Sequence, residues 1–140
     1  MPDRNRLRLH TFEASPKADG RAAARVVLLQ WTEKQIEGEA VCEDSPAGRL
    51  RCAADATARA LERAVDGRIT FEVLGVKTIH AFDCILAVVS LSSRLQGSTE
   101  RLVGSCIVSS ENPRGIVLAV LNATNRLVGQ DLMRIGLADG

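Results

Sequence analysis

The stretch SPAGRLRCAADATAR at residues 45–59 recurs as NPRGIVLAVLNATNR at residues 112–126. Both copies begin with a capping residue and Pro-x-Gly, and both reach Ala-Thr-x-Arg after the same number of residues. Ser and Asn side chains accept hydrogen bonds from the free N–H groups at a helix start, and Pro is tolerated at the first helical position. This gapless match predicts two helices that arose by duplication.

Each predicted helix follows a set of predicted strands. Hydrophobic alternation or β-branched runs indicate strands at 6–13, 25–31 and 35–42 in the first half, and at 69–82, 84–91 and 102–108 in the second. We therefore expect an α+β fold with two βββα repeats related by a pseudo-two-fold axis. The antiparallel sheets of the repeats would be covered by the two helices.

A chain of 140 residues fits one domain, which we assign to residues 1–140. The first βββα unit is expected at about 6–67 and the second at about 68–129, with a C-terminal tail at 130–140. One unit alone, at roughly 60 residues, would be marginally stable, so the two units are expected to pack together. The tail, which contains four apolar residues, is expected to dock on an edge or a neighbouring chain, with disorder as the alternative.

The two helices differ in polarity. Arg51, Asp55 and Arg59 form a charged face on the first helix, whereas residues 116–121 of the second are apolar almost all the way round. Such a helix is either sandwiched within the chain or part of an oligomer interface. We expect a homo-oligomer whose contacts come from Ile116, Val117, Val120 and Leu121.

Composition excludes several partners. The net charge is only +1, aromatic residues are 3% of the chain and Tyr is absent, so binding to nucleic acid or carbohydrate is disfavoured. The apolar runs are too short to span a membrane and no secretory signal precedes them, which favours a cytoplasmic protein. No cofactor or metal is expected, because the cysteines and histidines show no ligand spacing. The cysteines are expected to be reduced and buried: Cys42, Cys52, Cys84 and Cys106.

The two helix starts are the candidate ligand sites. Free N–H groups at a helix start attract anions, and glycine lets a ligand approach the backbone. A small anion or an amino acid could therefore bind there, and ordinary helix capping is the alternative. The residues concerned are Ser45, Gly48, Asn112, Arg114 and Gly115.

Three further side chains, Lys77, His80 and Asp83, are possible proton-transfer groups in a small enzyme. In a regular strand, however, Lys77 and Asp83 would point to one face and His80 to the other. Thr57 and Thr124 lie on the helix stripes, where packing is their default role and where they could also bond their own backbone carbonyls. No catalytic residues are assigned.

Residues 121–128 read Leu-Asn-Ala-Thr-Asn-Arg-Leu-Val, which resembles the ending of the C-terminal regulatory domain of 2-isopropylmalate synthase. The resemblance implies two βββα units, dimerisation and binding of leucine as a feedback inhibitor. The residues at 80–83 and 111–115 depart from the family's pattern where that family holds leucine, so the leucine site is not carried over. The sequence shows no counterpart of the synthase's barrel domain, so we do not expect synthase activity.

Taken together, these features predict a non-enzymatic, oligomeric ligand-binding or regulatory module similar to an amino-acid-sensing domain. A structural or assembly protein that forms a homo-oligomer is the first alternative. The second is a small enzyme with a site near Lys77, His80 and Asp83.

Overall fold

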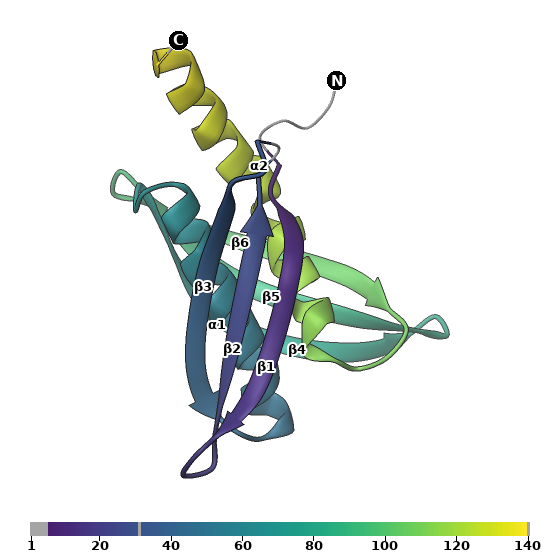
Figure 1. Ribbon diagram of the computed structural model, residues 1–140. Helices are drawn as coiled ribbons and strands as arrows, with labels where there is room; N and C mark the ends of the chain where they lie inside the picture. The colour runs from purple at the N-terminus through teal and green to yellow at the C-terminus, as the bar shows by residue number, and fades with distance from the viewer. Residues whose placement is uncertain (1–5, 31, 140) are drawn as a thin grey trace.

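The computed structural model describes residues 6–30 and 32–139, and its elements follow the order βββα twice (Figure 1). The first unit comprises β1 (Arg8–Lys17), β2 (Arg21–Leu29), β3 (Gln35–Glu43) and α1 (Pro46–Ala64). The second comprises β4 (Ile69–Ala81), β5 (Cys84–Leu95), β6 (Ser98–Val108) and α2 (Pro113–Asp139). The strands of each unit form one antiparallel sheet in sequence order. The predicted α+β fold of two βββα repeats is confirmed.

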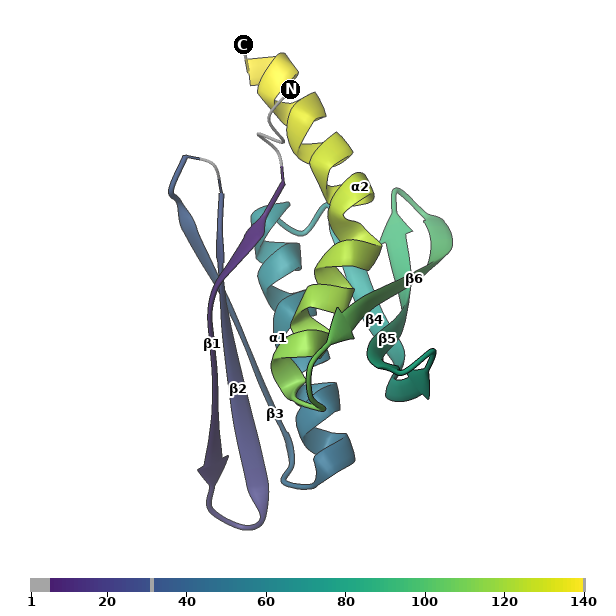
Figure 2. The same ribbon diagram turned by 90° about the vertical axis from the view of Figure 1, so that its right-hand side faces the viewer.

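The two helices lie between the two sheets (Figure 2). α1 packs on β2 and β3 of its own sheet and also contacts β4 of the other sheet. α2 packs on β5 and β6 and also contacts β1. Exchanging the two units therefore exchanges equivalent contacts, as the expected pseudo-two-fold relation requires.

The four residues expected to face a partner are instead buried inside the chain. Ile116, Val117 and Val120 are fully buried, and Leu121 is 5% exposed. α2 is apolar nearly all round because it lies between sheets rather than on the surface. The structure therefore corrects the position of the expected oligomer interface, whereas oligomerisation itself stays a prediction.

Each helix comes close to its own sheet at a glycine of the preceding strand. A Cβ atom added to Gly38 of β3 would lie 2.1 Å from the carbonyl oxygen of Ala56 in α1. One added to Gly104 of β6 would lie 2.3 Å from the carbonyl oxygen of Ala119 in α2. Only a residue without Cβ allows this approach. Strand and helix backbones are thus in direct contact in both units.

The buried threonines of the two helices make matching contacts. Thr57 Oγ1 donates to the Ala53 carbonyl at 2.7 Å, and Thr124 Oγ1 donates to the Val120 carbonyl at 2.9 Å. Both side chains are fully buried, and each hydroxyl satisfies its hydrogen bond within its own helix. This confirms the expected role of the threonines and supports the register of the sequence repeat.

The second unit was expected to end at about residue 129, but its helix continues to Asp139. Its continuation carries Asp131, whose Oδ2 atom lies 2.8 Å from Nη2 of Arg68 in the segment before β4. The Asp131 side chain is 1% exposed, and its other oxygen lies 3.1 Å from Nη2 of Arg134. The predicted tail is therefore a helical extension fastened to the start of the second unit.

The strands run further into the hairpins than predicted. β1, predicted to end at residue 13, continues through Pro16. It can do so because β1 is an edge strand, which tolerates a residue that cannot donate a backbone hydrogen bond. β5 and β6 also extend until only Gln96 and Gly97 remain between them, both with positive φ. Trp31, expected to end the second strand, and Gly140 of the expected tail lie outside the described residues.

Candidate functional site

The first helix start is occupied by a capping contact. Ser45 Oγ accepts a hydrogen bond from the Gly48 N–H at 3.0 Å. A Cβ added to Gly48 would lie 2.1 Å from the carbonyl oxygen of Glu43, so the tight turn from β3 into α1 requires glycine. The features that suggested a ligand site are thus used by the fold itself.

The second helix start has the same arrangement. Asn112 Oδ1 accepts from the Gly115 N–H at 3.3 Å, and Asn112 Nδ2 donates to Ser110 Oγ at 3.1 Å. A Cβ on Gly115 would lie 2.6 Å from Val108 Cγ1. Arg114 is exposed and has no hydrogen-bond partner among the described residues. The predicted site residues therefore lie at two separate starts, one in each unit, and anion binding at either start stays a prediction.

The three possible proton-transfer residues are not brought together. Lys77 and His80 are three positions apart in β4 and point to opposite faces, while Asp83 lies in the β4–β5 turn with φ 59°. His80 instead contacts Glu111, with Nε2 and Oε1 2.7 Å apart, on the surface. Hydrogen bonds with His80, and secondarily with Thr78, lower the pKa of the Glu111 carboxyl. His80, Asp83 and the Cys84 thiol line a hollow of about 510 Å³ at the β4–β5 turn, but neither Lys77 nor Glu111 lines it.

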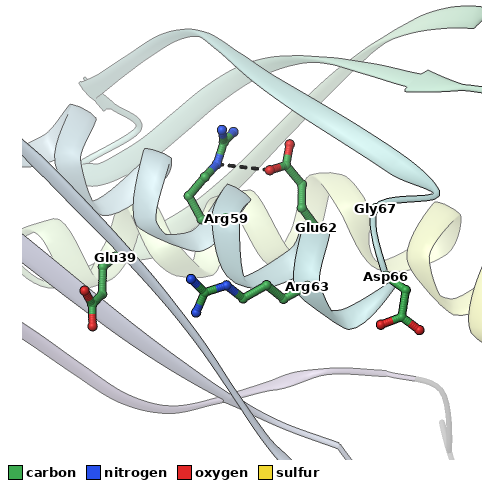
Figure 3. A pocket seen from close by; sticks show the side chains of 6 residues that line it. All are labelled: Glu39, Arg59, Glu62, Arg63, Asp66 and Gly67. Atoms are coloured by element: carbon green, nitrogen blue, oxygen red, sulfur yellow. Dashed lines mark ion pairs between the residues drawn. The ribbon is translucent and has the colours of Figure 1, made fainter.

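A groove of about 650 Å³ lies over α1, and we name it the α1 groove (Figure 3). Its lining residues are Glu39, Arg59, Glu62, Arg63, Asp66 and Gly67. Arg59 Nε lies 3.2 Å from Glu62 Oε1. Arg59 also donates to the carbonyl of Phe71 in β4 at 2.7 Å, and Glu62 Oε2 accepts from the Phe71 N–H at 2.8 Å. Arg63 donates to the Glu37 carbonyl at 2.9 Å. Charged side chains of α1 thus bind the backbones of β3 and β4 and contribute to the fold.

A second groove, of about 430 Å³, lies over α2 between β6 and the start of β1, and we name it the α2 groove. It is lined by Arg6, Leu7, Arg8, Leu9, Ser105, Cys106, Leu118, Leu121, Asn122 and Asn125. Leu9, Leu118 and Leu121 give it apolar walls. Asn122 and Asn125 contribute two carboxamides from successive turns of one helix. Apolar and polar groups therefore share a space of small-molecule size.

The two grooves occupy corresponding places in the two units. The strand glycine approaches the carbonyl of Ala56 in α1 and that of Ala119 in α2. In each helix, one polar residue of the groove lies three positions after this alanine and another lies six positions after it. α1 has Arg59 and Glu62 at these positions. α2 has Asn122 and Asn125. An ion pair anchored on a neighbouring strand in one unit is thus replaced by two amides in the other.

The polar groups of the α2 groove are only partly engaged. Asn122 Oδ1 accepts a long hydrogen bond, 3.4 Å, from the Ser105 N–H of β6. Within the described part of the chain, the side chains of Asn125 and Arg8 make no hydrogen bond or ion pair. The α2 groove therefore has hydrogen-bonding groups still available, whereas Arg59 and Glu62 of the α1 groove bind each other and the backbone of Phe71.

Asn122 and Asn125 belong to the sequence repeat and to the stretch that carries the family resemblance, but neither pattern predicted a role for them. The sequence repeat pairs these residues with Asp55 and Ala58, about one helical turn away from Arg59 and Glu62, the residues that the glycine contacts pair with them. The sequence repeat alone therefore gave no signal for the groove, in which Asn122 is exposed and Asn125 is half-buried.

The four thiols are unpaired, and only Cys52 is fully in the core. Burial, with a further contribution from neighbouring Cys42, raises the pKa of the Cys52 thiol to about 12. Cys42, Cys84 and Cys106 are half-buried, so the expectation of four buried thiols holds only for Cys52. Over residues 6–30 and 32–139, no three His, Cys, Asp or Glu side chains gather as a metal site would require.

Comparison with models of known protein families and with curated proteins finds no match to the chain. The resemblance to the 2-isopropylmalate synthase regulatory domain thus stays an expectation from residues 121–128. Among the described helices, none has the length and apolar character needed to cross a membrane.

Proposed function

We propose that this chain is a non-enzymatic regulatory module that binds a small carboxylate with an apolar side chain, such as an aliphatic amino acid, in the α2 groove. One observation carries the proposal: beside its leucines the second unit has Asn125, whose side chain makes no hydrogen bond among the described residues, and Asn122, whose side chain accepts only one long bond there, where the first unit has an ion pair bound to the backbone. In a duplicated scaffold where the charges of one groove bind each other and the backbone, ligand binding is favoured at the groove whose donors are still available.

The chemistry of the groove matches this ligand class. The carboxamide N–H groups of Asn122 and Asn125, and the guanidinium of Arg8 at the start of β1, are donors suited to a carboxylate. Leu118 and Leu121 offer apolar contact for the rest of the ligand. The resemblance of residues 121–128 to an amino-acid-sensing domain supports the same class. Since all four thiols are unpaired, we propose the cytoplasm as its location.

The first test compares leucine with two matched probes in thermal unfolding. Glycine keeps the carboxylate but lacks the apolar side chain, and leucinamide keeps the side chain but lacks the carboxylate. We expect leucine to raise Tm more than either probe, because only leucine uses both halves of the groove. At a free concentration of about 100 Kd, a single site stabilises the folded state by about 2.7 kcal/mol.

Two variants locate the effect. Asn125→Ala removes an unengaged donor and should reduce the leucine shift, whereas Glu39→Gln, in the α1 groove, should leave it unchanged. If no small apolar carboxylate stabilises the protein, or if both variants reduce the shift equally, the proposed function is wrong.

A further inference from the structure

The outer faces of the two sheets, turned away from the helices, differ in chemistry. On the first sheet, Arg25 of β2 is ion-paired with Glu37 of β3, and its Nε lies 4.0 Å from Glu39 Oε1. These pairs leave the centre of that face polar and internally neutralised. Such a face stays in water without cost.

The outer face of the second sheet is apolar near one end. Ile79, Leu86 and Ile107 lie next to one another across its three strands, in the register of the sheet. Ile107 is 71% exposed, and Val103, on the same face of β6, is 65% exposed. Phe82, in the β4–β5 turn just beyond Ile79, is 96% exposed and has φ 53°. The patch thus combines β-branched side chains with an aromatic residue held in an unfavourable backbone conformation.

This concentration is specific to the second unit. Seven large apolar residues are strongly exposed in the described part of the chain, and five of them belong to β4, its following turn or β6. The five are Leu74, Ile79, Phe82, Val103 and Ile107. Scattered exposed apolar residues are ordinary on a protein surface, but Ile79, Val103 and Ile107 share one face of the sheet, and such a set marks a contact surface.

Charges on the same face indicate what the partner is. Glu72 of β4 and Arg101 of β6 flank Ser92 of β5 in one row of the register. Both are exposed, and neither has an ion-pair partner among the described residues. One row therefore carries opposite, unneutralised charges at its two ends.

We infer that the outer face of the second sheet binds a second copy of this chain. A two-fold axis parallel to the strands places β4 of one copy over β6 of the other. Glu72 then faces the partner's Arg101, and Ile79 faces the partner's Ile107, each contact occurring twice. The Glu72 and Ile79 contacts are self-complementary, as a symmetric dimer requires, whereas Arg94 on the axial strand β5 meets its own copy at the far end of the face and weakens the dimer.

The size of the face fits a modest dimer. Three strands about 4.8 Å apart and some ten residues long, at about 3.3 Å each, give a face of roughly 500 Å² before side-chain relief. Specific interfaces bury about 800 Å² per partner, so this one lies at the lower end. We therefore expect a reversible dimer. Its formation does not depend on a ligand in the α2 groove.

Sedimentation equilibrium over the micromolar range tests this inference, with circular dichroism confirming that each variant is folded. The wild-type chain sediments as a monomer–dimer equilibrium. Ile107→Asp raises Kd at least about tenfold, because it puts two charges into the apolar part of the contact. Val41→Asp, at a 52% exposed position on the first sheet, leaves Kd unchanged.

The charge row gives a second, independent test. Glu72→Arg places like charges opposite each other and weakens the dimer, and adding Arg101→Glu to it restores the wild-type Kd. A wild-type chain that stays monomeric throughout, a dimer insensitive to Ile107→Asp, or a double variant as weak as Glu72→Arg would each overturn the inference. A chain that stays monomeric by itself and associates only with a different protein would also overturn the inference.

Discussion

Replacing Gly38 with Ala should lower the free energy of unfolding by about 3 kcal/mol, near the upper end of the cost of overpacking. The new Cβ would lie 2.1 Å from the carbonyl oxygen of Ala56 and 2.4 Å from the Ala60 nitrogen. Both are helix backbone atoms, which cannot rotate away as a side chain can. α1 would have to move off β3, and its buried alanines would lose contact with the sheet. Urea unfolding followed by circular dichroism measures the loss.

Gly75→Ala is the matched control. Gly75 lies at the bulge of β4, where a new Cβ would have no atom within 4 Å and φ is not positive. That variant should be neutral or slightly stabilising, because alanine restricts the unfolded chain. If Gly38→Ala cost no more than Gly75→Ala, the close contact between α1 and β3 would not exist as described.

Asp131→Ala should be the second strongly destabilising change, costing about 3 kcal/mol. Asp131 has a side chain that is 1% exposed, and it receives bonds from Arg68 at 2.8 and 2.9 Å. The hydrogen bond with Asp131 raises the pKa of the Arg68 guanidinium, which stays charged. Removing the carboxylate leaves that partly buried cation without its main partner. Urea unfolding again measures the change, and far-ultraviolet circular dichroism reports on the helical extension.

Asp66→Asn controls for a general effect of charge, because Asn also tolerates the positive φ of 50° at this position. Asp66 is another carboxylate near Arg68, at 3.6 Å, but its side chain is 86% exposed. An exposed pair contributes little, so that loss should stay below about 0.5 kcal/mol. Equal losses from the two variants would show that the buried pair does not fasten α2.

The helices were predictable because their signals are local. Ser45 and Asn112 cap their own helices, and the repeat of Pro-x-Gly follows from turns only a few residues long. The buried threonines repeat with the same spacing. Each of these contacts lies within about four residues of chain, which a single sequence can reveal.

The features that were missed depend on contacts between distant segments. The second unit was expected to end near residue 129, but its helix continues. In the continuation, Asp131 accepts a hydrogen bond from Arg68, more than sixty residues earlier in the chain. Likewise, no local pattern shows that Asn122 and Asn125 meet the start of β1 across a groove. Helix propensity and periodicity do not report such pairings, so tertiary contacts decided them.

Alkylation of Cys106 tests the groove most directly, because its half-buried thiol lines the α2 groove. The chain is treated with iodoacetamide with and without leucine, and modification at each cysteine is followed by mass spectrometry. Cys84, beside the β4–β5 turn, is the reference thiol, and Cys52, with a pKa of about 12, should stay unmodified while the protein is folded. We predict that leucine slows alkylation of Cys106 and leaves Cys84 unaffected. An unchanged rate at Cys106 under conditions where leucine raises Tm would contradict binding in the α2 groove.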